Sequence, residues 1–317
     1  MDKYTRLLKK LPAPGIGAGY HTGIFGVACA GRDAGLLPAQ IEKDIHAHTK
    51  TGARPVGESE IEGAVKAAFN RKSVEAKPYT GPRIRPNYLS ECLQNGRGAT
   101  FETLVRLSPT QIDWPDEDSW RALASLYEPD ALLFCGDDNT PGKIDHSIRT
   151  CEEWLAEFES EGITLQKFIP NPLTGEEAPK KSGDGFTFRG DACIVSHLYA
   201  VCESDALSLP DQCALWTTLI EKHWPVAMLT WSGKKSIHTL LRVKCRDASE
   251  WQTKIATELF KGFLIPMGMD PSCANPARLT RAPGFWRSDT DTIQRCLYIS
   301  PECNDRNSLA LKQAGVL

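Results

Sequence analysis

The hydrophobic pattern of the chain changes partway along, and this change limits the folds that it can adopt. Over roughly the first 70 residues, apolar side chains recur at helical spacing, as in Leu37, Ile41 and Ile45. A segment rich in proline and arginine follows at residues 76–87. Beyond it, strand-like and helix-like segments alternate, which argues against a helical bundle and favours an α+β or α/β fold.

This pattern predicts three parts. We expect a small all-α module at residues 1–75, a linker with connecting helices at 76–124, and an α+β domain at 125–317. Within the last part, the predicted strands are 130–135, 194–202, 225–231, 237–244 and 293–299, the predicted helices are 147–160, 211–223 and 248–264, and 171–190 is a predicted loop.

Composition indicates an ordinary soluble protein. The 317 residues are 41% hydrophobic and 24% charged, and no stretch approaches the roughly 18 to 20 consecutive apolar residues of a membrane span. The basic N-terminus lacks the apolar region of a signal peptide, so we expect a cytoplasmic protein with no membrane partner. Eleven cysteines without a CxxC pair favour reduced, mostly buried thiols over disulfides or zinc.

The net charge of −3 averages over segments of opposite sign. Residues 89–233 hold 10 Lys and Arg against 24 Asp and Glu, whereas residues 234–287 hold 10 against 4. A carboxylate cluster beside a phosphate-binding surface would produce this junction at 233/234, although solvated charged faces would do so as well.

Two carboxylates close the apolar strand predicted at 194–202. Side chains alternate along a strand, so Glu203 and Asp205 are expected on the same face. Paired carboxylates suit a divalent cation such as Mg²⁺ or Mn²⁺ that also binds substrate phosphates. The alternative is a solvated strand end.

Two cationic segments follow. The turn Ser232–His238 gathers Lys234, Lys235 and two hydroxyls, those of Ser232 and Ser236, within seven residues, a suitable cradle for a triphosphate. The alternative is a basic hairpin turn. Further along lie the guanidinium groups of Arg278 and Arg281, which suit phosphates.

One more carboxylate, Asp270, precedes the arginine-containing segment. It is a candidate third ligand for a cation. A turn-initiating Asp-Pro is the alternative interpretation.

In this order, the segments resemble the catalytic core of the archaeo-eukaryotic primase superfamily, especially the primase-polymerases of phages and plasmids. The family has an acidic pair after a hydrophobic strand, then a strand-turn-strand ending in Ser-x-His, then another carboxylate. Glu203 with Asp205, and Ser236 with His238, match that pattern. The phrases SGKKSIHTLLRV, ANPARLTRAPG and NPLTG look like the mobile-element branch.

The resemblance spans about residues 125–300 and implies an RRM-like β-sheet with flanking helices. It also implies a DNA primase or primase-polymerase that uses nucleoside triphosphates on a single-stranded DNA template. Glu203 and Asp205 would hold Mg²⁺ or Mn²⁺ with Asp270 as third ligand, and Ser236 and His238 would contact the nucleotide. By their charge, Lys234, Lys235, Arg278 and Arg281 would bind phosphates.

The N-terminal part is similar to the helical primase-associated module of this family, although that module usually follows the core. No helicase motif follows the core in this sequence, so a helicase would be a separate partner. Two other functions are open: an initiator or accessory DNA-binding protein with little synthesis, and a metal-dependent nuclease or strand-transfer enzyme. The latter would need a nucleophilic tyrosine or a histidine cluster, which Tyr199 and His197 do not supply convincingly.

Overall fold

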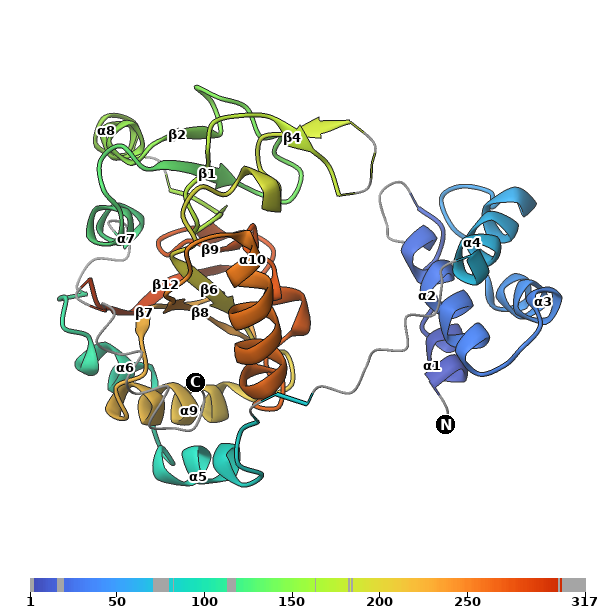
Figure 1. The fold of residues 1–317 in the computed structure, drawn as a ribbon, viewed down its shortest axis with the longest axis horizontal. Helices are drawn as coiled ribbons and strands as arrows, with labels where there is room; N and C mark the ends of the chain where they lie inside the picture. The colour runs from blue at the N-terminus through green and yellow to red at the C-terminus, as the bar shows by residue number, and fades with distance from the viewer. Residues whose placement is uncertain are drawn as a thin grey trace. The chain divides into compact units, whose positions relative to one another are not determined.

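The chain forms two compact units, Met1–Pro78 and Tyr79–Leu317. The structure is a computed structural model, drawn in Figure 1, that describes residues 3–15, 20–70, 80–81, 83–112, 118–162, 164–181, 183, 185–301 and 303. Together the units make a mixed α+β protein with antiparallel sheets, as the sequence predicted. None of the helices in the described ranges is long and apolar enough to cross a membrane.

The first unit is helical in its described residues. Its helices are α1 (Lys3–Lys9), α2 (Tyr20–Asp33), α3 (Pro38–His48) and α4 (Glu58–Asn70). Their apolar stripes meet in one core that includes Ile24, Ile41 and Ile61, all fully buried. Gly31 lets α2 approach α3, because a Cβ there would lie 2.7 Å from the side chain of Ile41.

Helices of the predicted connecting region belong to the second unit. They are α5 (Tyr88–Asn95), α6 (Phe101–Leu107) and α7 (Asp118–Leu126). Phe101 packs on Trp231 with ring centroids 5.3 Å apart, and the Thr218 hydroxyl donates to the Cys92 carbonyl. These helices therefore help to build the main core. Residues 76–79, 82 and 113–117 of the predicted linker lie outside the described residues, as do residues 71–75 of the predicted all-α module.

A four-stranded antiparallel sheet forms the centre of the second unit. Its strands are β6 (Tyr199–Cys202), β7 (Val226–Trp231), β8 (Ile237–Arg242) and β12 (Arg295–Ile299), in the order β12-β7-β8-β6. Strand β8 lies between β6 and β7, so that β6, helix α9 (Leu209–Glu221) and β7 form a split β-α-β unit. An RRM-like sheet would place its last strand beside its first, whereas β12 lies beside β7.

A second sheet supplies the other side of the candidate site. It consists of β1 (Leu132–Gly136), β2 (Ile148–Thr150), β3 (Lys167–Phe168) and β9 (Thr280–Arg281), in the order β2-β1-β3-β9. Helix α8 (Cys151–Glu161) follows β2. The remaining short elements are β4 (Ala178–Pro179), β5 (Phe186–Thr187), η2 (Asp191–Cys193), η4 (Pro271–Ala274), β10 (Trp286–Arg287) and β11 (Thr292–Ile293).

Three predicted elements need correction. The helix predicted at 147–160 begins at Cys151, because residues 148–150 pair with β1 and Thr150 forms a capping box with Glu153. The strand predicted at 194–202 is paired as β6 only from Tyr199. The helix predicted at 248–264 is a short α10 (Ala248–Glu250) continued by a π-helix, η3 (Trp251–Leu264).

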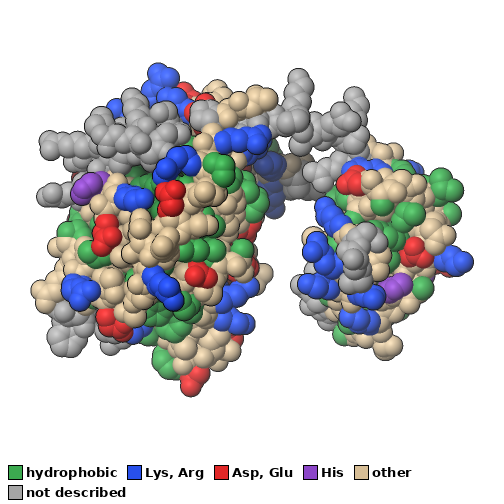
Figure 2. All heavy atoms as spheres, turned by 90° about the horizontal axis from the view of Figure 1, so that it is seen from below, with side chains coloured by type: hydrophobic (Ala, Val, Ile, Leu, Met, Phe, Trp, Pro, Cys, Tyr) green, Lys and Arg blue, Asp and Glu red, His purple; other side chains and the backbone are tan. Residues whose placement is uncertain are grey.

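The surface and the thiols agree with the composition. On the face of the second unit drawn in Figure 2, Lys and Arg side chains lie among Asp and Glu side chains. All eleven cysteines are free thiols, and all except Cys29 and Cys245 are buried.

Candidate functional site

A polar cleft of about 270 Å³ opens where the two four-stranded sheets of the second unit meet. It is lined by Asp138, Lys167, Glu203, Asp205, Ser232, Lys234, Lys235, Ser236, His238, Arg278, Leu279, Thr280, Arg281 and Arg287. Nine of the ten residues singled out in the sequence are in this lining; the tenth is Asp270. The fold thus brings together segments that are far apart in the sequence.

The acidic pair lies just beyond β6, not within it. Pairing ends at Cys202, so strand alternation does not by itself place Glu203 and Asp205, although both line the cleft. Their surroundings differ: the Glu203 side chain is 15% exposed, whereas that of Asp205 is 66% exposed. Asp205 pairs with Lys235, Oδ2 to Nζ, at 3.1 Å.

Glu203 is the most highly connected side chain in the cleft. Its carboxylate accepts hydrogen bonds from Arg278 and, at 3.6 Å, from the Cys273 thiol. His238 Nε2 lies 3.1 Å from Glu203 Oε2. A buried carboxylate is stabilised by such a charged partner and by donors around it.

His238 contacts Glu203 as a neutral imidazole. Burial lowers the pKa of His238 to about 4, and the nearby carboxylate of Glu203 only partly opposes this. At neutral pH the imidazole is therefore uncharged, and its contact with Glu203 is not an ion pair. Thr280 Oγ1 lies 3.3 Å from the other ring nitrogen, Nδ1, and its hydroxyl can donate to that atom or accept from it.

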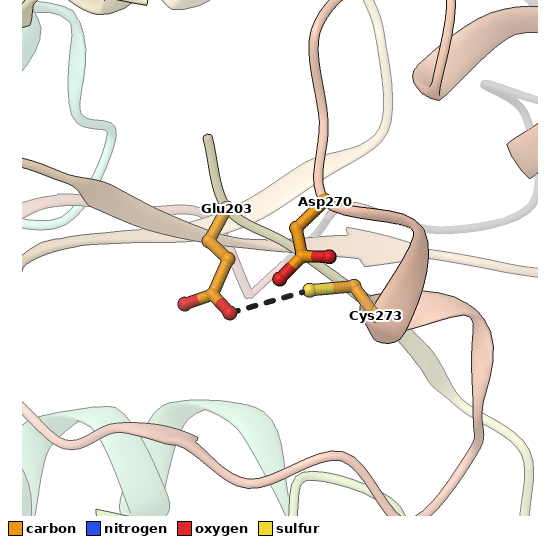
Figure 3. Close-up of side chains that lie close together, drawn as sticks. All are labelled: Glu203, Asp270 and Cys273. Atoms are coloured by element: carbon orange, nitrogen blue, oxygen red, sulfur yellow. Dashed lines mark hydrogen bonds between the residues drawn. The ribbon is translucent and has the colours of Figure 1, made fainter. Parts of the chain in front are cut away.

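Asp270 and Cys273 approach Glu203 from the loop and turn at η4, as Figure 3 shows. One potential ligand atom from each of the three residues lies within 4.8 Å of the others. Asp270 also caps the η4 turn through Ser272, with its Oδ1 accepting from the Ser272 amide at 2.8 Å. The structure confirms the turn-initiating interpretation of Asp270, and its role as a cation ligand stays a prediction. Burial raises the pKa of the Cys273 thiol to about 12, so it is a donor to Glu203 at neutral pH.

The β7–β8 turn is held in one conformation from both sides. Gly233 has a φ of +78°, and a Cβ there would lie 2.6 Å from Thr292 Oγ1, so only glycine fits. The hydroxyls of Ser232 and Ser236 lie 3.2 Å apart, and Arg287 donates to the Ser232 carbonyl at 2.8 Å. Ser232 and Ser236 are both buried, so they shape the turn as well as line the cleft.

A second group of cations lines the wall formed by β3, β9 and β10. Lys167 is paired with Asp138, and Arg287 with Asp289. Arg281 makes no ion pair with the described residues, and its buried NH1 atom has no hydrogen-bond partner there. Burial lowers the pKa of Arg281, and the charge of Arg287 lowers it further. An anion bound here would offset both the burial of the Arg281 charge and its repulsion by Arg287.

Sequence reasoning assigned no role to five residues in or beside the cleft: Asp138, Lys167, Cys273, Thr280 and Arg287. Thr280 lies next to Arg281 within the arginine-containing segment, and because both line the cleft, strand alternation does not account for its place there. Asp138 follows β1 and Lys167 lies in β3. Strand β3 pairs with both β1 and β9, and these pairings are tertiary contacts.

The oxygen donors of the cleft suit Mg²⁺ or Mn²⁺. Glu203 and Asp270 lie together, but Asp205 is paired with Lys235 and is not part of that group. Arg278 contacts Glu203 and lies 3.8 Å from Asp270. A cation held by these carboxylates would replace Arg278 as their neutralising charge.

Comparison with known proteins identifies no relative for this arrangement. No family model, curated protein or solved structure matches the chain.

Proposed function

We propose that the chain is a template-dependent nucleotidyltransferase that synthesises primers on single-stranded DNA, similar to the archaeo-eukaryotic primases. The observation that carries the proposal is the cleft itself. Carboxylates from the end of β6, the Lys-containing β7–β8 turn and the arginines around β9 line one cavity. A nucleoside triphosphate with a divalent cation needs carboxylates and cations side by side.

The charges of the cleft support a polyphosphate ligand. Arg281 lacks an acidic partner among the described residues, and Lys234 is exposed at the turn. These two side chains are free to bind phosphate oxygens. Arg278 would also bind phosphate if its ion pair with Glu203 were broken. Lys235 would do the same on leaving Asp205.

The neutral His238 has a different task. Its Nε2 lies 3.1 Å from Glu203 Oε2 and would hold the carboxylate toward the cleft, while Thr280 Oγ1 contacts Nδ1 and would fix the ring. Glu203, Asp205 and Asp270 would hold Mg²⁺ or Mn²⁺. When bound, the metal would favour ionisation of the primer 3′-hydroxyl and neutralise charge that develops on the α-phosphate.

Primer synthesis is tested by incubating the protein with single-stranded DNA, Mg²⁺ or Mn²⁺ and labelled nucleotides, without primer. We expect labelled products from the wild type, and a loss of at least roughly 10²-fold in Glu203→Gln and Asp205→Asn. Glu221→Gln is the matched control, because this exposed carboxylate at the end of α9 is outside the cleft lining.

The result separates this function from a non-catalytic one. If the wild type binds DNA but makes no product with or without a primer, the chain is an initiator or accessory DNA-binding protein. The ion pair of Arg278 with Glu203 favours that second function, because it neutralises the carboxylate without a metal. A replicative helicase on another chain stays a predicted partner.

A further inference from the structure

We infer that Gln212 is a positioning residue that fixes the acidic loop after β6 to the β7–β8 turn. The role as a positioning residue rests on the proposed function, since it concerns the geometry of the same cleft. Gln212 itself is outside the cleft lining and is 0% exposed.

Gln212 lies in the first turns of α9, which begins with Ser208 as its N-cap. The same helix buries the apolar side chains of Leu215, Trp216 and Leu219. A glutamine buried among such residues is destabilising unless its amide is fully hydrogen-bonded. Four contacts satisfy this requirement.

Two of the contacts are on the acidic side of the cleft. Gln212 Nε2 donates to the Leu207 carbonyl at 2.8 Å and lies 3.3 Å from the Ser204 carbonyl, which shares one of its two N–H groups. Ser204 stands between Glu203 and Asp205, and its own hydroxyl donates to the Gly268 carbonyl at 2.7 Å. The backbone between the two carboxylates is therefore held from α9 and from the loop that leads to Asp270.

The other two contacts are with the β7–β8 turn, the proposed phosphate-binding side of the cleft. Nε2 donates to the Lys235 carbonyl at 3.0 Å, and Oε1 accepts from the Ile237 amide at 2.7 Å. The Ile237 N–H requires an acceptor, so the amide atom that contacts it is the oxygen, Oε1. One side chain thus spans the loop at 204–207 and the turn at 235–237.

One amide group therefore contributes directly to the separation of carboxylates from cations in the cleft. Enzymatic rates are sensitive to such spacing, since a misplacement of about 1 Å can cost roughly 10²-fold. Loss of the amide would shift the metal-binding and phosphate-binding groups relative to each other without removing any of them.

The test uses the full chain with Gln212→Glu, a substitution of nearly the same shape. A protonated Glu side chain still accepts from Ile237 and donates to one carbonyl, whereas an ionised one has no donor and faces carbonyl oxygens. Relative to wild type at the same pH, we expect kcat/KM for nucleotide to fall roughly 10²-fold at pH 8 and to recover in part at pH 6. A pH-independent loss, or none, would overturn the inference.

A matched control separates positioning from stability. Thr218→Val removes one buried hydrogen bond from the same helix, to the Cys92 carbonyl, at a site outside the cleft lining. We expect nucleotide KM and kcat to stay within about twofold of wild type. An equal loss of activity in this variant would reduce Gln212 to a structural residue.

Amide hydrogen exchange tests whether Gln212 links the loop at 204–207 to the turn at 235–237, and it requires no measurement of activity. In Gln212→Met, we expect faster exchange at the Ile237 amide than in wild type or Thr218→Val. Unchanged exchange would overturn the link. If the wild type makes no primers and Ile237 still loses protection, the proposed function fails while the link between loop and turn stands.

Discussion

At the scale of single residues, two charged side chains of the cleft differ in their partners: Glu203 has several, whereas Arg281 has no ion-pair partner among the described residues. Glu203 contacts Arg278, His238 and Cys273, so its negative charge is already stabilised. Arg281 has no such partner among the described residues, and burial disfavours its charge. A buried unpaired charge is costly, and an anionic ligand would remove that cost.

The first prediction therefore concerns Arg281. Arg281→Gln should raise the Kd for a nucleoside triphosphate by roughly 10 to 100-fold, the equivalent of about 1.5–3 kcal/mol for charged hydrogen bonds. Arg97→Gln, an exposed arginine outside the cleft, should bind like wild type. Isothermal titration calorimetry on both variants gives the two constants. Equal affinity in wild type and Arg281→Gln would contradict a phosphate contact.

A second prediction follows from His197, a buried residue outside the cleft lining. It packs against Trp251 with ring centroids 5.5 Å apart, and neither ring nitrogen has a partner in the described part of the chain. Burial lowers the pKa of His197 below its usual value, which is about 6.5 in an unfolded chain. The unfolded state then binds more protons as the pH falls below about 6.5, so this residue makes the protein less stable there.

His197→Phe should remove this contribution and keep the ring contact. The measurement is urea unfolding of wild type and variant between pH 8 and 5. We expect the free energy of unfolding to fall less steeply in the variant as the pH drops. Parallel curves would show that His197 is not responsible.

At the scale of elements, one amide side chain binds the backbone where the edge strand β6 begins. Asn171 Oδ1 accepts from the amides of Leu198, at 2.7 Å, and Tyr199, at 2.8 Å. Its Nδ2 donates to the carbonyls of Tyr199 and Pro276. Asn171 is 1% exposed, and it ties the predicted 171–190 loop to the strand that carries the acidic pair.

A third prediction tests this tie. Asn171→Ala would leave up to four buried backbone groups without their partner, so the free energy of unfolding should fall by roughly 2–4 kcal/mol. Asn275→Ala removes one exposed hydrogen bond, to Ser272, and should cost well under 1 kcal/mol. Denaturant unfolding measures both. A loss in Asn171→Ala no larger than in Asn275→Ala would show that water replaces the amide.

At the scale of the whole molecule, the two units have separate hydrophobic cores. The described core residues of the first unit all come from the segment up to Ala68, and those of the second from Tyr88 onward. The described cleft lining, from Asp138 to Arg287, belongs entirely to the second unit. Nucleotide binding should therefore be a property of that unit.

A fourth prediction follows for a shortened chain. Residues 79–317 alone should fold, with a near-UV circular dichroism spectrum and a nucleotide affinity within about threefold of those of the whole chain. The reason is that separation removes no residue from the main core or the cleft. Loss of fixed tertiary structure would show that the second unit depends on the first.

The local sequence pattern was sufficient to predict whether most elements are helices or strands, but it was less accurate for the residues at which they begin and end. The helices and the β7–β8 hairpin follow from periodicity and turn chemistry, which are properties of neighbouring residues. Strand β2 was missed because a three-residue strand carries little periodic signal, and its pairing with β1 defines it. The start of β6 was missed because Asn171, far away in the sequence, binds the preceding amides.

The sequence by itself determined the α+β class, the helical first part and the residue types of a candidate phosphate and cation site. Only the tertiary structure decided which of these residues meet. It separated Asp205 from the Glu203 and Asp270 group, supplied Lys167 and Asp138 through a second sheet, and placed Gln212 between the acidic loop and the turn. The physical reason is range: periodicity and capping act within a few residues, whereas ion pairs, buried hydrogen bonds and sheet order depend on contacts between distant segments.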